Sequence, residues 1–410
     1  MTFSSTTYFV GLFLVLLQLL AAVPWVLVSF FNRDTLLAWK RRPFASDLLP
    51  YYGLVLAVLF LTPALFPYFV HEGTALEAWG QIYGAALQVQ LLLDVFVCVF
   101  VLLLLFWPKG GAIALAAFRE GLRQPMFWLL FGVAFMAMSI SPLIPYFTFG
   151  EDHLVVKDLG YDTIMLVAAV FGALAASMSI SEEIEGRTAV TLMSKPVSRR
   201  QFLIGKFVGI TLAAGVLFAL LGTYFEGVVR FKHWWDKMDP EATPVWVVET
   251  LQRWALPGVT TDFLRGIGLW THLTLDTWPG LVLGFAQVMV LIAIAVTLAT
   301  RVPMVVNLVV VVVIFFLAHL TPVLVAIGYQ AQANDPGSAV SQILAFMAQL
   351  LDTLLPDLDL FRLDPSLLNE TPLAAGAFTR FLGSVSLYGL LYTSIVLLFG
   401  LILFEDRDLA

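Results

Sequence analysis

Long apolar runs separated by short polar connections dominate the pattern of hydrophobic and polar positions along this chain. A helix needs about 20 apolar residues to cross roughly 30 Å of hydrocarbon, and nine runs reach or approach that length. The predicted spans are residues 8–31, 50–70, 84–107, 126–147, 162–180, 203–224, 280–300, 303–328 and 382–404. The pattern therefore predicts an all-α, polytopic transmembrane helical protein.

One further segment, 339–355, has apolar residues at helical spacing but is interrupted by Gln342, Gln349 and Asp352. Polar residues within so short a run favour a helix that lies in the membrane interface or re-enters the bilayer. A tenth span at this position is the alternative.

Composition supports a membrane protein and excludes other classes. Apolar residues make up 60% of the chain and charged residues 12%, which lies outside the range of soluble globular domains. The net charge of -7 comes without a basic tract interleaved with aromatic residues, so we expect no nucleic acid partner. The lipid bilayer is the first partner that the sequence predicts.

The distribution of Lys and Arg over the connections indicates the orientation in the membrane. These residues concentrate on the connections after the first, third and fifth spans, whereas the short connection 71–80 carries Glu72 and Glu77 without any Lys or Arg. Cytoplasmic connections carry the positive excess in membrane proteins. We therefore expect a multi-pass protein of the cell (inner) membrane, with its N-terminus outside and its C-terminus cytoplasmic.

A break after the third span divides the chain into two parts. The sequence Pro-Lys-Gly-Gly occupies residues 108–111, and such residues interrupt regular structure. We predict an N-terminal three-span transmembrane unit, 1–111, and a six-span unit, 112–410.

Residues 112–124, directly after this break, have the pattern of an amphipathic elbow helix in the cytoplasmic interface. Apolar residues, among them Phe118, alternate at helical spacing with the polar positions Arg119, Glu120 and Arg123. A plain juxtamembrane linker is the alternative.

Two long connections are expected on the outer side. The first, 225–279, contains six of the eleven tryptophans, a residue that favours membrane interfaces. We predict that it folds onto the outer leaflet as short helices, with a cap over an exit path as the alternative. The second, 329–381, includes alternating carboxylates at Asp357 and Asp359. Because the glycine turn of a calcium loop is missing, we expect a solvated turn there.

A polar island interrupts the apolar pattern between the fifth and sixth predicted spans. It opens with an acidic cluster, continues with a short apolar helix and reaches Pro196, which ends that helix. Ser198 is then placed to cap the next helix. We predict a cytoplasmic segment, 181–202, that offers a docking surface. A helix that anchors the loop to lipid is the alternative.

The order of motifs in this island resembles the signature of ABC-2 type permeases, in particular the subgroup associated with multi-copper-enzyme maturation and gliding motility. The matching motifs are Glu183-Ile184-Glu185-Gly186-Arg187-Thr188, Leu192-Met193-Ser194, Pro196-Val197-Ser198-Arg199, Phe202-Leu203 and Gly205-Lys206. The resemblance covers about 112–410 and implies that 181–202 is a coupling segment. The residues that it assigns to ATPase coupling are Glu182, Glu183, Glu185, Gly186, Arg187, Thr188, Leu192, Ser194, Lys195, Pro196, Ser198, Arg199, Arg200, Gly205 and Lys206.

This resemblance also implies a fold and a mode of action. The expected fold is a type V ABC exporter-like six-helix core with three extra N-terminal helices, arranged as a homodimer or heterodimer of permeases. A cytoplasmic ABC ATPase subunit would bind ATP and Mg²⁺, with no cofactor in this chain, and drive export of an unidentified substrate. Two alternatives are a mechanotransmitter that acts on an extracytoplasmic protein partner, and a membrane scaffold or assembly factor without an ATPase.

The sequence contains no recognisable enzyme motif. Gly205-Lys206 lacks the upstream glycine and the following Ser or Thr of a Walker A loop, and the five histidines form no HExxH pair. We expect no catalytic residue and no metal site in this chain.

Several polar side chains lie within predicted spans, and Asp94, Gln287 and His319 are the candidates singled out among them, beside Gln18, Gln88, Gln90 and Asn307. Polar groups at such positions are costly and often functional. A proton site, or a polar contact that joins the N-terminal unit to the core, is the functional hypothesis. Hydrogen bonds to neighbouring helices are the structural alternative, which we favour.

Overall fold

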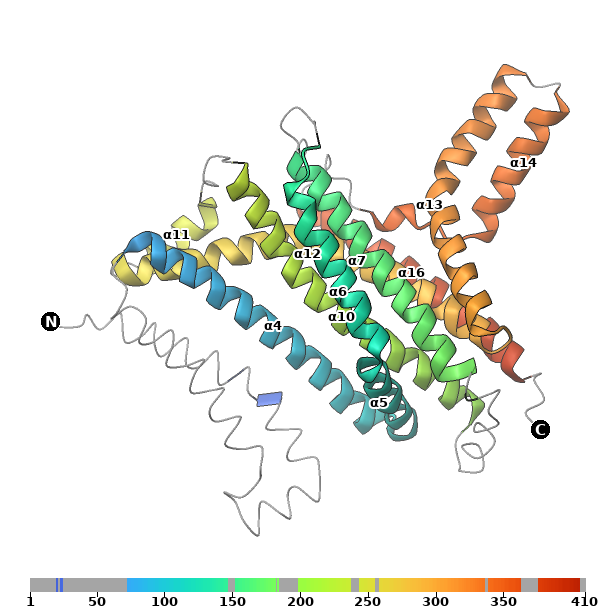
Figure 1. The fold of residues 1–410 in the computed structure, drawn as a ribbon, viewed down its shortest axis with the longest axis horizontal. Coiled ribbons are helices and arrows are strands. Elements are labelled where there is room, and N and C mark those ends of the chain that lie inside the picture. The colour runs from blue at the N-terminus through green and yellow to red at the C-terminus, as the bar shows by residue number, and fades with distance from the viewer. Residues whose placement is uncertain are drawn as a thin grey trace, which may run out of the picture. The chain divides into compact units, whose positions relative to one another are not determined.

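The computed structural model describes residues 20, 23–24, 72–146, 152–181, 183, 198–236, 243–254, 258–335, 338–362 and 375–405. These residues form helices and connecting turns, with no β-strand among them (Figure 1). The predicted all-α class is confirmed. The first two predicted spans, 8–31 and 50–70, lie almost entirely outside the described residues.

Seven helices in the described part of the chain are long and apolar enough to cross a membrane. They are α4 (Gly73–Phe106), α6 (Pro125–Ile140), α7 (Asp152–Ala176), α10 (Arg199–Trp235), α12 (Gly258–Ala299), α13 (Met304–Asn334) and α16 (Ala375–Glu405). Each overlaps one of the seven remaining predicted spans, and together they support a multi-pass membrane protein.

The segment 225–279 differs from the prediction of a loop with short helices. Helix α10 continues to Trp235, and α12 already begins at Gly258, so α11 (Val245–Trp254) is the one short helix in the described part of this segment. Hydropathy marks only the part of a helix that crosses hydrocarbon, whereas backbone hydrogen bonds extend the helix for as long as no residue stops it. Pro279 lies inside α12 without ending it.

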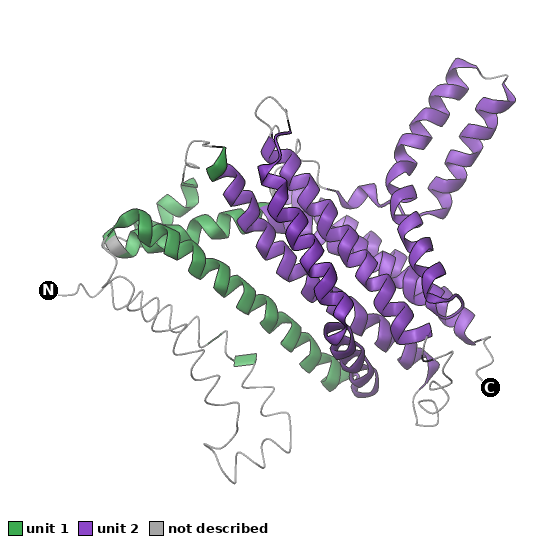
Figure 2. Cartoon of the chain, viewed as in Figure 1, with its two compact units in different colours: residues 1–106, 234–276 green, residues 107–233, 277–410 purple. Residues whose placement is uncertain are grey.

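The chain forms two compact units (Figure 2). The first contains Met1–Phe106 and Trp234–Asp276, and the second contains Trp107–His233 and Thr277–Ala410. The linear pattern did not indicate that 234–276 groups with the N-terminal part, because this grouping depends on contacts between helices far apart in the sequence.

In the first unit, α4 and the first part of α12 approach backbone to backbone. A Cβ atom added to Gly80 or Gly266 would lie 2.1 or 2.0 Å from a carbonyl oxygen of the opposite helix. Small residues allow such close crossings between membrane helices. Beside the crossing, the Trp270 Nε1–H donates to Gln88 Oε1 at 2.6 Å, and the Thr274 hydroxyl donates to the same oxygen at 3.1 Å.

In the second unit, α7, α10 and the second half of α12 form most of the core. In the most apolar window of each helix, 78% of α7 and 72% each of α10 and α12 is buried, against 28% for α6 and 22% each for α13 and α16. Helices α6, α13 and α16 therefore expose their apolar side chains on the outside of the bundle. In a membrane protein this outer surface faces lipid or a partner subunit.

The short helix α14 (Ala339–Leu354) packs against α13 as a helical hairpin (Figure 1). Its 16 residues rise about 24 Å, which is less than the roughly 30 Å of hydrocarbon in a bilayer. This length favours the predicted interfacial or re-entrant helix over a tenth span.

The turn after α14 is not simply solvated, as was expected for 329–381. Leu358 is fully buried, and the backbone N–H of Asp357 donates to the Tyr388 hydroxyl at 3.1 Å. Burial raises the pKa of the Asp357 carboxyl, although backbone hydrogen bonds from Asp359 and Leu360 oppose the shift. Leu358 is thus buried while Asp359 and Leu360 are exposed, a difference that the composition of the turn did not reveal.

Candidate functional site

The elbow helix α5 (Pro108–Arg123) begins four residues earlier than predicted. Proline is well suited to the first position of a helix, because no intrahelical donor is lost there. The packed face consists of small residues rather than the large apolar ones. Its buried members are Gly110, Gly111, Ala114, Ala117 and Gly121.

This face of α5 lies directly on the start of α10. A Cβ atom added to Gly209 would lie 2.3 Å from the Ala114 carbonyl oxygen, and one added to Gly205 would lie 3.0 Å from the Gly110 carbonyl oxygen. The two glycines are four residues apart and so share one face of α10. Glycine at both positions is what permits the contact.

A charged cluster lies where α5, the end of α7 and the start of α10 meet. The Lys206 ammonium donates to Glu183 Oε1 at 2.6 Å and to the Ser179 hydroxyl at 2.8 Å. Glu120 Oε2 lies 3.6 Å from the same ammonium and accepts the Ser179 hydroxyl at 2.9 Å. We call Glu120, Ser179, Glu183 and Lys206 the Lys206 cluster.

Burial makes Lys206 the centre of this cluster. Its side chain is 6% exposed, whereas Glu183 is 25% and Glu120 42% exposed. A buried ammonium is costly unless it is paired and hydrogen-bonded. The three partners meet that requirement, and the two carboxylates together outweigh the single positive charge.

The last turn of α7 is a π-helical segment, η2 (Ser177–Ser181), and its three serines bond three different parts of the bundle. Ser177 accepts a hydrogen bond from the Asn307 side chain at 2.8 Å. Ser179 belongs to the Lys206 cluster. Ser181 donates to the Ala299 carbonyl at 2.9 Å. Single π-helical turns occur often at functional sites, and this one lies just before the predicted coupling segment.

Replacing Asn307 with leucine should lower the free energy of unfolding, because Asn307 holds the η2 segment to α13 through its hydrogen bond to Ser177. Asn307 is fully buried and also donates to the Ala295 carbonyl at 2.9 Å, so the change removes two buried hydrogen bonds at a cost of about 1–3 kcal/mol. Denaturant titration in mixed micelles measures the loss. The exposed Asn334 ends the same helix, and Asn334→Leu should change the unfolding free energy by less than about 0.5 kcal/mol. Equal effects of the two changes would contradict the role of the network.

The start of α10 confirms the predicted cap at Ser198. The Ser198 hydroxyl accepts the backbone N–H of Gln201 at 3.2 Å, and the Gln201 side chain accepts the backbone N–H of Ser198 at 3.2 Å. This reciprocal pair is a capping box. It fixes the point at which the chain re-enters a helix after the polar island.

The two arginines that follow the cap contact the end of α16. Arg199 donates to the carbonyl oxygens of Phe404 and Glu405, both at 2.8 Å, and lies over the Phe404 ring. Arg301 donates to the Leu403 carbonyl, and Arg200 pairs with the Glu405 side chain at 3.4 Å. Cations at a helix C-terminus satisfy the last carbonyls and suit the helix dipole.

Replacing Arg199 with glutamine should loosen the last turn of α16. The lost interactions with two terminal carbonyls correspond to about 1–2 kcal/mol of local stability, or roughly fivefold to thirtyfold faster amide exchange. Hydrogen exchange of residues 400–405 measures this change. Arg380 is exposed near the start of the same helix, so Arg380→Gln should leave that exchange unchanged. Unaltered protection in Arg199→Gln would refute the capping role.

Several residues of the predicted coupling set lie outside the described residues. These are Glu182, Glu185, Gly186, Arg187, Thr188, Leu192, Ser194, Lys195 and Pro196. Among the predicted elbow residues, Glu120 enters the Lys206 cluster, Phe118 is half-buried, and Arg119 and Arg123 are exposed.

The predicted intramembrane polar residues have different surroundings. The Gln287 amide and the His319 Nε2 lie 3.2 Å apart across α12 and α13, and His319 Nδ1 lies 2.7 Å from the Phe315 carbonyl. This geometry agrees with hydrogen bonding between neighbouring helices. Asp94 is buried on α4 in the first unit. Among the described residues, no group of three or more His, Cys, Asp and Glu side chains could hold a metal ion.

Sequence reasoning missed Ser177 and Ser179. Serines within an apolar run carry little signal by themselves, since their role depends on which helices lie beside them. Their spacing of two residues would place them on different faces of an ordinary α-helix. In the structure they accordingly contact different partners, Ser177 with Asn307 and Ser179 with Glu120 and Lys206.

Residues 122–261 match the family model described as ABC-2 family transporter protein. The matched region runs from the end of α5 to the beginning of α12 and includes the η2 segment, the polar island and Lys206. No curated protein matches the chain. The match supports an ABC-2 permease, which is a membrane component of an ABC transporter.

Proposed function

We propose that this chain is the membrane-spanning permease subunit of an ABC-2 exporter, driven by ATP hydrolysis in a separate cytoplasmic ATPase subunit. The family match supports the permease. The Lys206 cluster carries the coupling part of the proposal, because it joins the two ends of the polar island that has the family's motif order. That motif order favours the subgroup of multi-copper-enzyme maturation and gliding-motility permeases. The substrate is unidentified.

The cluster supports a mechanical role for segment 181–202. The segment is attached near its acidic end by the ion pair between Glu183 and Lys206, which lies on α10 four residues after the segment ends. Glu120 links the same ammonium to the elbow helix. A push on the segment would therefore act on α5, α7 and α10 together. Coupling of this kind requires an element with two arrangements whose balance the partner shifts.

The face that carries the Lys206 cluster is proposed to be cytoplasmic. Arg199, Arg200 and Arg301 lie at the same end of the second unit, together with the exposed Arg119 and Arg123 of α5. Positive charge gathers on the cytoplasmic side of membrane proteins. This orientation puts the C-terminus in the cytoplasm and, with an odd number of spans, the N-terminus outside.

The partner ATPase would bind ATP and Mg²⁺, and the permease would work as a homodimer or heterodimer. Two closing ATPases need two coupling segments, which is the reason for proposing a dimer. The outward-facing apolar surfaces of α6 and α13 are compatible with a partner subunit or with lipid.

Affinity purification of the tagged full chain from native membranes tests the proposal. A protein with Walker motifs should co-purify, and its ATPase activity should fall at least about tenfold when Glu183→Lys and Arg199→Glu are combined. Arg253 is exposed on α11, so Arg253→Glu should leave both results unchanged. Absence of an ATPase from the purified complex would favour a scaffold or assembly factor.

One observation favours mechanotransmission as a second candidate function. Trp234, Trp235, Trp246 and Trp254 of the first unit are exposed, with Trp234 at 72%. Tryptophan is enriched at protein interfaces as well as in membrane interfaces. If these residues bind an extracytoplasmic protein, replacing Trp246 and Trp254 by serine should abolish its capture while the ATPase still co-purifies.

A further inference from the structure

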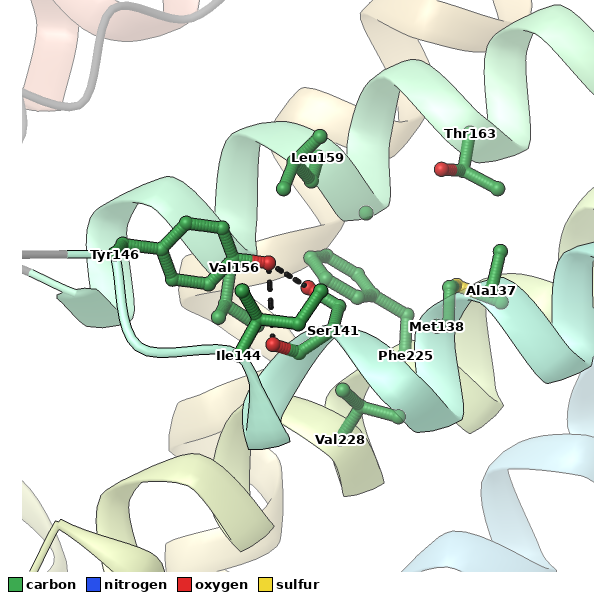
Figure 3. Close-up of a pocket in the computed structure, with 11 residues that line it drawn as sticks. Ala137, Met138, Ser141, Ile144, Tyr146, Val156, Leu159, Thr163, Phe225 and Val228 are labelled. Carbon is green, nitrogen blue, oxygen red and sulfur yellow. Dashed lines mark hydrogen bonds between the residues drawn. The ribbon is translucent and has the colours of Figure 1, made fainter.

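A pocket of about 200 Å³ lies between α6, α7 and α10 in the second unit. Figure 3 shows its lining, to which α6 contributes Met138, α7 contributes Val156, and α10 contributes Phe225 and Val228. These four side chains are buried. The pocket belongs to the bundle core and shares no residue with the Lys206 cluster.

The chemistry of the lining selects a largely apolar ligand. No charged side chain lines the pocket, and an ion without a partner would pay a large desolvation cost there. The space exceeds that of apolar cavities of about 150 Å³ that bind benzene, but it is smaller than the roughly 300 Å³ of a drug site. A segment of hydrocarbon chain fits these limits.

One side of the pocket carries a pair of hydroxyl groups. The Tyr146 hydroxyl lies 2.9 Å from the Ser141 hydroxyl and donates to the Ser141 carbonyl at 3.1 Å (Figure 3). Because a Tyr hydroxyl has one proton and a Ser hydroxyl can rotate, Ser141 retains the capacity to donate to a ligand oxygen. The pair therefore suits an ester carbonyl or a hydroxyl at the end of an apolar chain.

The rim of the pocket continues into the apolar outer surface of the bundle. The lining residues Ile144 and Leu159 are 44% and 42% exposed, and Ile140 and Leu143 beside them are 49% and 54% exposed. These side chains would be in contact with acyl chains in a bilayer. A lipid chain can therefore reach the pocket sideways, without crossing a polar layer.

The depth of the pocket matches the far leaflet. Phe225 follows Lys206 by 19 residues on α10, which is about 28 Å along a helix axis, close to the roughly 30 Å thickness of the hydrocarbon region. Beyond it, the Lys232 ammonium lies 3.8 Å from Asp152, a charged pair suited to the polar interface. The Ser141 and Tyr146 hydroxyls thus lie near the level where ester groups meet acyl chains.

We propose that this pocket binds an acyl chain of a membrane lipid from the leaflet opposite the Lys206 cluster, with the ester group at Ser141 and Tyr146. The proposal goes beyond transport, since it requires neither an ATPase nor a substrate. A bound chain would pack between α6, α7 and α10 and thereby resist changes in their spacing.

Photolabelling in nanodiscs tests the site. The full chain is reconstituted with phosphatidylcholine that carries a diazirine near the end of one acyl chain, and labelled peptides are mapped by mass spectrometry. Labels should appear on the buried walls at Met138, Val156 and Phe225. Labels confined to outward residues such as Val133 and Met136 would overturn the proposal.

Variants separate the pocket from the general lipid surface. Ala137→Phe and Thr163→Leu fill the pocket from two different helices and should each lower wall labelling by about tenfold. Gly132→Phe adds bulk to α6 where nothing lies within 4 Å, so it should leave wall labelling unchanged. Wild-type labelling in either filled variant that still folds would refute the pocket as the site.

The hydroxyl pair has its own test. Tyr146→Phe keeps the ring but removes one hydroxyl, so wall labelling by the phosphatidylcholine probe should fall about threefold, whereas wall labelling by an alkane that carries a diazirine but no ester should stay as before. Equal wall labelling by the phosphatidylcholine probe in wild type and Tyr146→Phe would contradict the placement of the ester group.

Discussion

Replacing Lys206 with methionine is expected to lower the free energy of unfolding by about 2–3 kcal/mol and to release the elbow helix from the end of α7. The change keeps an unbranched apolar stem but removes the charge that holds Glu120 and Glu183 together. The cost is less than for a fully buried pair, because the Glu120 and Glu183 side chains are 42% and 25% exposed. Denaturant titration of the purified chain in mixed micelles measures it.

A double-mutant cycle isolates the interaction. Lys206→Met, Glu183→Gln and the double variant should give a coupling energy of about 1–2 kcal/mol. Arg253 and Glu249 form an exposed pair on α11 at 3.7 Å, and the equivalent cycle there should give less than about 0.5 kcal/mol. A coupling energy for the Lys206 pair as small as that of the α11 pair would mean that the cluster does not join the helices.

Gly209→Leu should displace the elbow helix from α10. A Cβ atom at this position would already lie 2.3 Å from the Ala114 carbonyl oxygen and 2.8 Å from the Ala117 Cβ, so the two helices must separate. Overpacking of this kind costs about 3 kcal/mol. In a Cys98→Ala background, a cysteine introduced at the buried Ala114 should change from protected to reactive with a water-soluble maleimide.

The same helix provides the control for this prediction. Gly227 also lies in α10, but nothing lies within 4 Å of a Cβ added there. Gly227→Leu should therefore leave the cysteine at position 114 protected, and its higher helix propensity should stabilise α10 by up to about 1 kcal/mol. Protection of that cysteine in Gly209→Leu would show that α5 does not depend on the close contact.

The hydrophobic pattern predicted the spans because the bilayer imposes a local rule. A spanning helix must be predominantly apolar over about 20 positions, and this requirement can be read without knowing the neighbours. Helix ends were harder to predict, since α10 and α12 continue past the hydrocarbon on polar and aromatic residues. The cap at Ser198 was predictable because its partner Gln201 is only three residues away.

Pairing between distant residues could not be read from the same pattern. The motif order included both Glu183 and Lys206, but it did not show that these two residues form an ion pair across 23 positions. Nor did it show that Ser179 bonds both Lys206 and Glu120. The elbow helix shows the same limit. Its large apolar residues suggested the packed face, whereas close approach to the glycines of α10 selected its smallest residues.

By itself, the sequence determined an all-α membrane protein, the positions of seven spans in the described region, and a polar island with the motif order of an ABC-2 permease. Only the tertiary structure decided which helices group with 234–276, which side chains surround Lys206, and where the bundle leaves an apolar pocket. The reason is physical. Transfer of a helix into lipid depends on its own composition, whereas burial of a charge, a glycine contact or a cavity depends on what the opposite helix presents.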